Sequence, residues 1–210
     1  MKKSYALLTT SLLLATTGYN PKVKAQPNVT NIVDLRPQQF PVELLRWVDC
    51  ATTIATSTPI SDGELSRLIR VVVDESPNKD PDFLKLVFAV AVVESKLNRF
   101  AVSPTGAVGL MQLSLIGAQE AEQQCPVLRP TLGESSKALQ LRLLGVRDNV
   151  KYGTCLLDYY LKQAGGNTMN ALVLYNGGYQ QLTRLVSSAT LTNETQQYIL
   201  RVHSLLGRCQ

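Results

Sequence analysis

A glutamate closes an unusually apolar stretch of this chain. Residues 86–93 are all apolar (LVFAVAVV), and Glu94 follows them directly. On a helix this glutamate shares a face with Val87, Val90 and Ala91, so its carboxyl lies at the rim of a buried segment. Burial disfavours the charged form and raises the pKa, which leaves a carboxyl able to donate a proton near neutral pH. Cleavage of a glycosidic bond requires such a donor, because the departing sugar oxygen has to be protonated.

Periodicity alone leaves a second interpretation open, in which Glu94 is a surface or capping residue at a helix end. Nucleophilic catalysis has little support, since His203 is the only histidine and no G-x-S-x-G or reactive-cysteine motif accompanies it. No Asp or Glu occurs between Glu94 and Glu120, so the adjoining loop cannot supply the partner carboxylate of a two-carboxylate glycosidase. No metal-ligand spacing, phosphate loop or dinucleotide motif is present, so we expect neither a metal nor a cofactor.

The elements that position Glu94 are predicted to be helices. Ser61 and Glu64 form a capping box, and Asp80 followed by Pro81 begins the helix that leads to Glu94. A loop is expected over residues 98–105. No convincing alternating strand appears, so the fold class predicted is all-α. The remaining helices are predicted over residues 42–54, 106–122, 135–144, 148–164, 167–178, 179–187 and 193–206.

Three segments are expected along the chain. Residues 1–25 have a positive start, an apolar stretch and a small-x-small cleavage pattern, which predicts a signal peptide and a mature chain from Gln26. An uncleaved membrane anchor is the alternative, but the apolar stretch is too short to span a bilayer. Residues 26–60 are interpreted as a lead-in with a short helix, and residues 61–207 as the catalytic domain. We therefore expect an exported, periplasmic or secreted protein.

The charge and the cysteines limit the classes of partner and compartment. The formal net charge of the 210 residues is +5, but the first 25 hold four lysines and no acid. The remainder is nearly neutral and has no dense basic patch, so nucleic acid is not an expected partner. An even number of cysteines in an exported chain predicts two disulfides, with buried free thiols as the alternative and the pairing open. The four are Cys50, Cys125, Cys155 and Cys209.

Five short motifs resemble those of one enzyme family. Residues 94–98 (ESKLN) and 103–113 (SPTGAVGLMQL) closely resemble the signature of lytic transglycosylases of the soluble-enzyme (SLT) type. Residues 149–157 (NVKYGTCLL), 174–178 (LYNGG) and 194–199 (ETQQYI) resemble later motifs of that family, in the family's order. The resemblance implies a lysozyme-like helical domain in which Glu94 is the acid and then the base. It implies cleavage of the β-1,4 bond between N-acetylmuramic acid and N-acetylglucosamine without water, which leaves 1,6-anhydro ends.

The resemblance also implies contacts between the segment after Glu94 and the glycan. Gln112 can donate and accept hydrogen bonds with an acetamido group. Ser103 resembles the family's loop serine, which approaches the acetamido and C6 region of the sugar. Met111 offers an apolar wall to a sugar face, and plain core packing is the alternative for it. Gly106 and Gly109 allow the predicted helix to approach Glu94 or the sugar closely, and simple helix packing is the alternative for Gly106.

Four further candidates come from the later motifs. Tyr175 is expected to hydrogen-bond to Glu94 or to the sugar, and Asn176 to tie down the turn before the glycines. Glu194 and Tyr198 match a pair whose contacts support the substrate cleft. For Glu194 a second interpretation is open, because an acid is favoured in the first turn of a helix whatever its function.

Two other functions remain open at this stage. A lysozyme-type muramidase keeps the fold and Glu94 but adds water, and a catalytically silent protein binds peptidoglycan within an envelope-spanning machine. The expected partners are peptidoglycan glycan strands. The lack of a wall-binding repeat leads to the hypothesis that a secretion, conjugation or pilus apparatus recruits the protein, which is expected to be a monomer.

Overall fold

The structure is a computed structural model that describes residues 40–55, 60–128 and 134–209. The signal peptide predicted over residues 1–25, and most of the lead-in expected over residues 26–60, lie outside the described residues. Among the helices that are described, none is both long and apolar enough to cross a membrane.

Side-chain caps fix where the helices begin. The Ser61 hydroxyl accepts the backbone N–H of Glu64 at 3.3 Å, and Asp80 accepts that of Asp82 at 2.9 Å, just ahead of Pro81. These contacts satisfy N–H groups that a first helical turn leaves unpaired. The helices of the described residues are α2 (Val42–Ala55), α3 (Asp62–Glu75), α4 (Pro81–Ser95), α5 (Leu115–Gln124), α6 (Ser136–Arg142), α7 (Val146–Gln163), α8 (Thr168–Val186) and α9 (Asn193–Arg208).

The helix predicted over residues 106–122 is wrong in its first half. Residues 101–113 form a loop closed by two isolated β-bridges, and α5 begins only after it. The backbone φ is positive at Gly106 (87°), Gly109 (78°) and Gln112 (46°). A right-handed helix cannot contain such residues, so the small side chains that suggested a helix face belong to turns.

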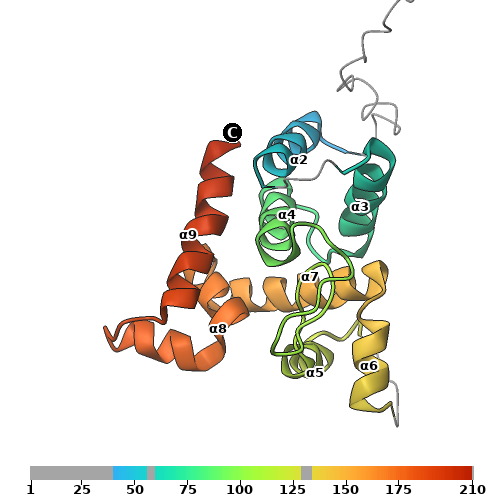
Figure 1. Cartoon of the computed structure of the whole chain (residues 1–210). Helices are drawn as coiled ribbons and strands as arrows, with labels where there is room; N and C mark the ends of the chain where they lie inside the picture. The colour runs from blue at the N-terminus through green and yellow to red at the C-terminus, as the bar shows by residue number, and fades with distance from the viewer. Residues whose placement is uncertain (1–39, 56–59, 129–133, 210) are drawn as a thin grey trace, which may run out of the picture.

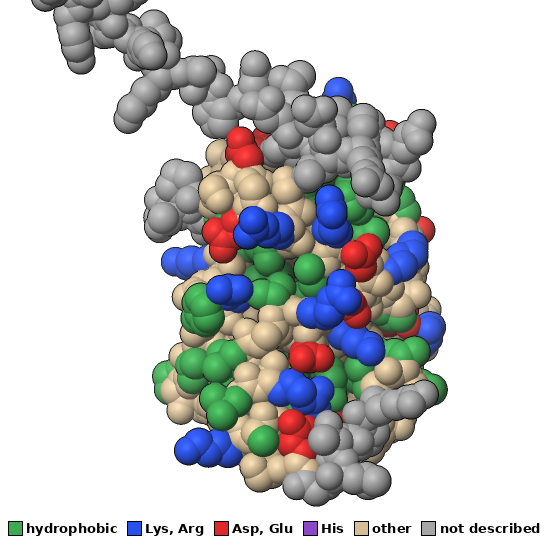
Figure 2. Space-filling view, turned by 90° about the vertical axis from the view of Figure 1, so that its right-hand side faces the viewer, with side chains coloured by type: hydrophobic (Ala, Val, Ile, Leu, Met, Phe, Trp, Pro, Cys, Tyr) green, Lys and Arg blue, Asp and Glu red, His purple; other side chains and the backbone are tan. Residues whose placement is uncertain are grey.

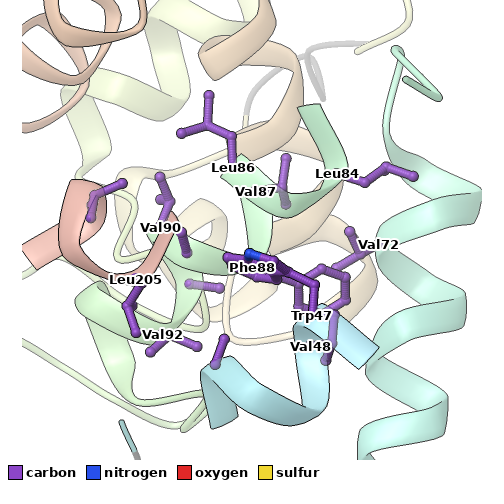
Figure 3. Packing of buried hydrophobic residues seen from close by; sticks show 14 of the residues in the cluster. Trp47, Val48, Val72, Leu84, Leu86, Val87, Phe88, Val90, Val92 and Leu205 are labelled. Atoms are coloured by element: carbon purple, nitrogen blue, oxygen red, sulfur yellow. The ribbon is translucent and has the colours of Figure 1, made fainter. Parts of the chain in front are cut away.

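Figure 1 shows how the helices are arranged. Two hydrophobic clusters hold them together. The larger surrounds α4, against which Trp47 of α2, Val72 of α3 and Leu205 of α9 pack (Figure 3). The smaller lies among α5, α6, α7 and α8 and includes Leu139 and Tyr152. Helix α7 crosses the molecule between the clusters and contacts α3, α5 and α8. The two clusters therefore meet along α7, with the end of α4 close to their junction.

Two disulfides connect distant parts of the chain. Cys50 of α2 pairs with Cys209 at the end of α9, and Cys125 after α5 pairs with Cys155 of α7. The prediction of two disulfides is confirmed, and the pairing that the sequence left open is now assigned. The second bridge fixes α5 against α7, next to hydrogen bonds between the same two helices.

Charged side chains of both signs are interspersed on the face that carries α3 and α6 (Figure 2). Several of them form ion pairs, such as Arg142 with Glu134 at 2.9 Å and Arg147 with Glu75 at 3.1 Å. This mixing agrees with the small net charge of the chain beyond residue 25.

Candidate active site

Glu94 lies in the last turn of α4, at the edge of the larger hydrophobic cluster. The helix ends at Lys96, whose backbone is left-handed (φ 53°). Next to Glu94, the buried Ser95 hydroxyl lies 2.7 Å from the carbonyl oxygen of Leu110 and 3.0 Å from that of Ala91. The end of α4 is thereby fixed to the loop over residues 101–113. Glu94 itself is partly buried between the core and this loop.

Burial raises the pKa of Glu94 from its ordinary value of 4.5 to about 8. Three side chains of α9 modify this value: the Tyr198 hydroxyl and the Arg201 charge lower the pKa, and the Glu194 charge raises it. Their spacing places all three on one face of α9, which therefore points at the carboxyl. At neutral pH the carboxyl is mostly protonated, as a general acid has to be. The direction of the shift is the one that the apolar run before Glu94 predicts.

Tyr198 presents a buried hydroxyl to this carboxyl. The residue is 2% exposed, and its oxygen makes no hydrogen bond of ordinary geometry within the described residues. Burial and the charge of Glu94 raise the pKa of Tyr198 well above its usual 10, so the phenol stays neutral. Its hydroxyl is a donor that favours the charged form of the Glu94 carboxyl.

Polar side chains hold the loop over residues 101–113 in shape. Gln112 donates both amide hydrogens to backbone carbonyls, to Ala101 at 3.0 Å and to Gly109 at 2.9 Å. The Ser103 hydroxyl accepts the backbone N–H of Ala107 at 2.9 Å. In this conformation a sugar contact by Gln112 has to use the amide oxygen, because both donors are engaged.

Asn149 of α7 also holds this loop in place through hydrogen bonds to its backbone. It is fully buried, and its amide nitrogen donates to the carbonyls of Val108 at 2.9 Å and Leu143 at 2.8 Å. Its amide oxygen accepts the backbone N–H of Met111 at 2.7 Å. A Cβ at Gly109 would lie 2.3 Å from the Asn149 amide nitrogen, so only glycine permits this approach. The loop is therefore bonded to α7 as well as to α4.

Tyr175 of α8 contacts the loop at Met111. Met111 is 0% exposed, and its sulfur would lie 2.5 Å from a Cβ at Gly153, so the side chain is packed in the core. The Tyr175 hydroxyl donates to the Met111 carbonyl oxygen at 3.0 Å. Burial, then the charge of Glu94, raises the pKa of Tyr175 well above its usual 10, which places the two side chains near each other.

Helix α8 breaks where the sequence predicts a boundary. Gly178 has φ 67° and ψ −171°, so α8 consists of two helices joined at a kink, and Asn176 lies partly buried just before it. After the kink, Tyr179 is 49% exposed and packs edge-on to Tyr160, with ring centroids 6.3 Å apart. The Tyr160 hydroxyl in turn donates to Glu120 at 2.7 Å. After the kink, the Tyr179 ring is therefore exposed to solvent on one side and packed against the buried Tyr160 ring on the other.

One comparison with known proteins decides the family. The model of the transglycosylase SLT domain matches residues 73–197. The chain belongs to this family. Family membership confirms the lysozyme-like all-α fold, and it supports a transglycosylase-type function on peptidoglycan, outside the cytoplasm. The matched residues extend from the end of α3 to the first turns of α9.

The SLT fold brings some of the predicted site residues together and separates others. Tyr175, Tyr198 and Glu194 all interact electrostatically with Glu94. Ser103 and Gln112 shape the neighbouring loop, and Asn176 precedes the kink of α8. Met111 lies in the core, where the alternative interpretation of the sequence put it.

Sequence reasoning missed two residues that contribute to the candidate site. Arg201 acts on Glu94 from α9, and the available signal was its position one helical turn beyond Tyr198. Asn149 was noted only as part of a motif, although a polar residue beside the apolar Val150 on a predicted buried helix was a usable signal. Arg201 and Tyr198 both lie beyond the residues that the family model matches.

Proposed function

We propose that the chain is an active lytic transglycosylase that cleaves the β-1,4 bond between N-acetylmuramic acid and N-acetylglucosamine with Glu94 as its acid and base. The observation that carries this proposal is the environment of Glu94. Its carboxyl has a pKa raised to about 8, and it faces the buried phenol of Tyr198 and the cation of Arg201. Near neutral pH, a group with such a pKa can give up a proton and take one back.

In the first step, the Glu94 carboxyl gives its proton to the glycosidic oxygen. The bond between that oxygen and C1 of the muramic acid breaks, and the N-acetylglucosamine leaves as an alcohol. Positive charge then develops at C1, and the N-acetyl group of the substrate stabilises it. Glu94 is now a carboxylate in a partly buried site, where the Tyr198 hydroxyl and the Arg201 charge stabilise it.

In the second step, the Glu94 carboxylate takes the proton from the C6 hydroxyl of the same muramic acid. The C6 oxygen bonds to C1, which closes the 1,6-anhydro ring, and Glu94 ends protonated as it began. Water takes no part in either step of this reaction. Glu194 is the carboxylate that acts on Glu94 from α9, and it is exposed in the first turn of that helix. We assign it a role in keeping Glu94 protonated rather than one at C1.

The glycan contacts of the proposal come from the loop and from α8. The Gln112 amide oxygen and the Ser103 hydroxyl are assigned to the acetamido and C6 region, and Asn176 to the turn that carries Tyr175. The exposed ring of Tyr179 adds an apolar face with a polar edge, the kind of surface that a sugar ring covers well.

Mass spectrometry of the muropeptides released from purified peptidoglycan tests the proposal, with Glu94→Gln as the matched variant. We expect 1,6-anhydro-muramic ends from the wild type and none from the variant. Reducing ends instead would show a muramidase that adds water. Binding to the wall without release of any product would show a silent binding protein.

We further propose that residues 1–25 direct export and are then removed, so that the mature chain begins at Gln26. Two disulfides support this proposal, because such bridges persist in oxidising compartments. The mass of the protein recovered from the periplasm or the medium tests it. Recruitment by a secretion, conjugation or pilus apparatus is a separate proposal. Full activity of the purified protein on intact wall sacculi would count against it.

A further inference from the structure

Helix α6 contacts the loop over residues 101–113 at the turn formed by residues 103–107. The side-chain amide of Gln140 donates to the backbone carbonyl oxygen of Gly106 at 2.8 Å, across 34 residues of sequence. Both residues are partly buried, so water competes with this hydrogen bond only in part. The turn is therefore bonded to a helix that carries none of the proposed catalytic side chains.

The turn over residues 103–107 is otherwise bonded within itself. The backbone N–H of Ser103 donates to the Ala107 carbonyl at 2.9 Å, and the Ala107 N–H donates to the Ser103 hydroxyl at 2.9 Å. The Gly106 N–H donates to the Ser103 carbonyl at 3.0 Å. These bonds fix the shape of the turn but not its position relative to Glu94. Among the described residues, the hydrogen bond that reaches the turn from another element is the one from Gln140.

Helix α6 is in turn held by the body of the domain. The Arg142 guanidinium donates to the Glu122 carboxylate of α5 at 3.4 Å and lies 2.9 Å from the Tyr152 hydroxyl of α7. On the same short helix, Leu139 is 5% exposed and packs in the smaller hydrophobic cluster. The position of Gln140 is therefore set by α5 and α7, independently of the loop that it contacts.

The turn carries Ser103, which the proposed function assigns to the acetamido and C6 region of the sugar. Because the Ser103 oxygen accepts the Ala107 N–H, its own O–H hydrogen is left for a second acceptor. The Thr105 hydroxyl, 2.9 Å away, or a substrate oxygen can fill that place. A shift of the turn would displace the C6 hydroxyl from C1, and a displacement of about 1 Å can slow a reaction about 100-fold.

We propose that Gln140 is a positioning residue, which fixes the turn carrying Ser103 through the Gly106 carbonyl and so favours attack on C1 by the C6 hydroxyl over attack by water. The proposal rests on the function proposed above. In the competing reaction, the oxygen of a water molecule bonds to C1 and one of its protons goes to the Glu94 carboxylate. That reaction gives a reducing end in place of the 1,6-anhydro ring.

A series of substitutions at Gln140 separates the hydrogen bond from the helix. Methionine, lysine and glutamate are close to glutamine in length and in helix propensity. Lysine keeps a donor, methionine has none, and glutamate at neutral pH has acceptors alone. We expect Gln140→Met and Gln140→Glu to lower kcat for anhydro products about 10-fold and to release reducing ends as well, whereas Gln140→Lys stays within about twofold of wild type.

Mass spectrometry of the released muropeptides gives the ratio of reducing to anhydro ends in each variant. Gln163→Glu, at the exposed end of α7, is the control for the added charge and should keep the ratio of the wild type. A merely structural role would lower the melting temperature and slow the enzyme without changing this ratio. An unchanged ratio in Gln140→Met and Gln140→Glu, or an equal change in Gln140→Lys, would overturn the proposal.

Amide hydrogen exchange separates failure of this proposal from failure of the proposed function, because it needs no substrate. We expect the backbone amides of Gly106 and Ala107 to exchange about fivefold faster in Gln140→Met than in wild type, while the Ala118 amide of α5 keeps its rate. Equal exchange at all three would overturn the positioning role even if the wild type forms anhydro ends. Faster exchange in a protein that forms no anhydro ends would confirm the contact but remove the reaction that it was proposed to serve.

Discussion

The side-chain oxygen of Asn149 accepts the backbone N–H of Met111 at 2.7 Å, across 38 residues of sequence. The same amide donates to the carbonyls of Val108 and Leu143, so one buried side chain satisfies three backbone groups. These three hydrogen bonds hold the loop over residues 101–113 in place beside the end of α4. The loop has no regular secondary structure to hold it there otherwise.

We expect Asn149→Ala to lower the free energy of unfolding by about 3 kcal/mol or more, because three buried backbone groups lose their partner at once. Urea unfolding followed by circular dichroism measures the change. Asn193→Ala, at an exposed position of α9, is the matched control and should remain within about 0.5 kcal/mol of wild type. Equal stability of the two variants would contradict the anchoring role.

Two glycines of the loop should respond differently to the same substitution. Both have positive φ, which costs an alanine about 1 kcal/mol. At Gly106 the nearest atom to a new Cβ is 3.4 Å away, whereas at Gly109 the Asn149 amide would be 2.3 Å away. Gly109→Ala is therefore expected to lower the melting temperature clearly more than Gly106→Ala, and to lower kcat with it. Thermal unfolding of both variants, with activity measured below the transition, checks this order.

Glu94→Gln should stabilise the protein increasingly as the pH rises. The pKa of Glu94 is about 8 in the folded chain against an ordinary 4.5, so the folded state holds an additional proton between these values. Stability of the wild type therefore falls from about pH 4.5 to about pH 8, and the neutral glutamine avoids this loss. Melting temperatures measured from pH 4 to pH 9 should diverge in favour of the variant. Glu43→Gln, at an exposed position, is the control, and the difference between its melting temperature and that of the wild type should stay nearly constant over this pH range.

Tyr198→Phe should move the pH dependence of activity upward. The Tyr198 hydroxyl lowers the pKa of Glu94, so its removal raises that pKa and shifts the alkaline limb of kcat/KM above pH 8. Since the carboxylate form also loses a donor, we expect kcat to fall by about 10- to 100-fold. A limb that moves downward would exclude this role for Tyr198.

The two disulfides should differ in what they contribute to stability. They close sequence separations of 159 residues (Cys50 to Cys209) and 30 residues (Cys125 to Cys155). The loop-closure entropy of the unfolded chain then predicts losses of about 5 and about 3.5 kcal/mol when each pair is replaced by serines. Urea unfolding of the two double variants gives the order, and a larger loss for the shorter loop would contradict it.

Local signals predicted the helices and the position of Glu94 well. Ser61 and Asp80 each cap the helix that they were expected to begin, and the glycines before Tyr179 mark the break in α8. The eight apolar residues before Glu94 predicted both the buried helix and the direction in which the pKa of Glu94 is shifted. These features depend on neighbours in sequence, which periodicity and capping describe directly.

The features that the sequence did not predict depend on packing between distant segments. The loop over residues 101–113 carries small residues at helical spacing, and the positive φ of Gln112 has no signal in its residue type. The face that α9 turns toward Glu94 arises from the contact between α4 and α9, which no local pattern specifies. The pairing of the four cysteines has the same origin.

The bridge between Cys50 and Cys209 makes the polypeptide from α2 to the end of α9 a covalent ring. A single cut by a protease in any loop inside this ring, for instance between α8 and α9, leaves the two pieces joined until the bridge is reduced. The two pieces of such a nicked chain stay covalently linked, and the chain runs as one band on a non-reducing gel. The topology of the chain therefore lets the protein tolerate a single proteolytic cut without separating into two pieces.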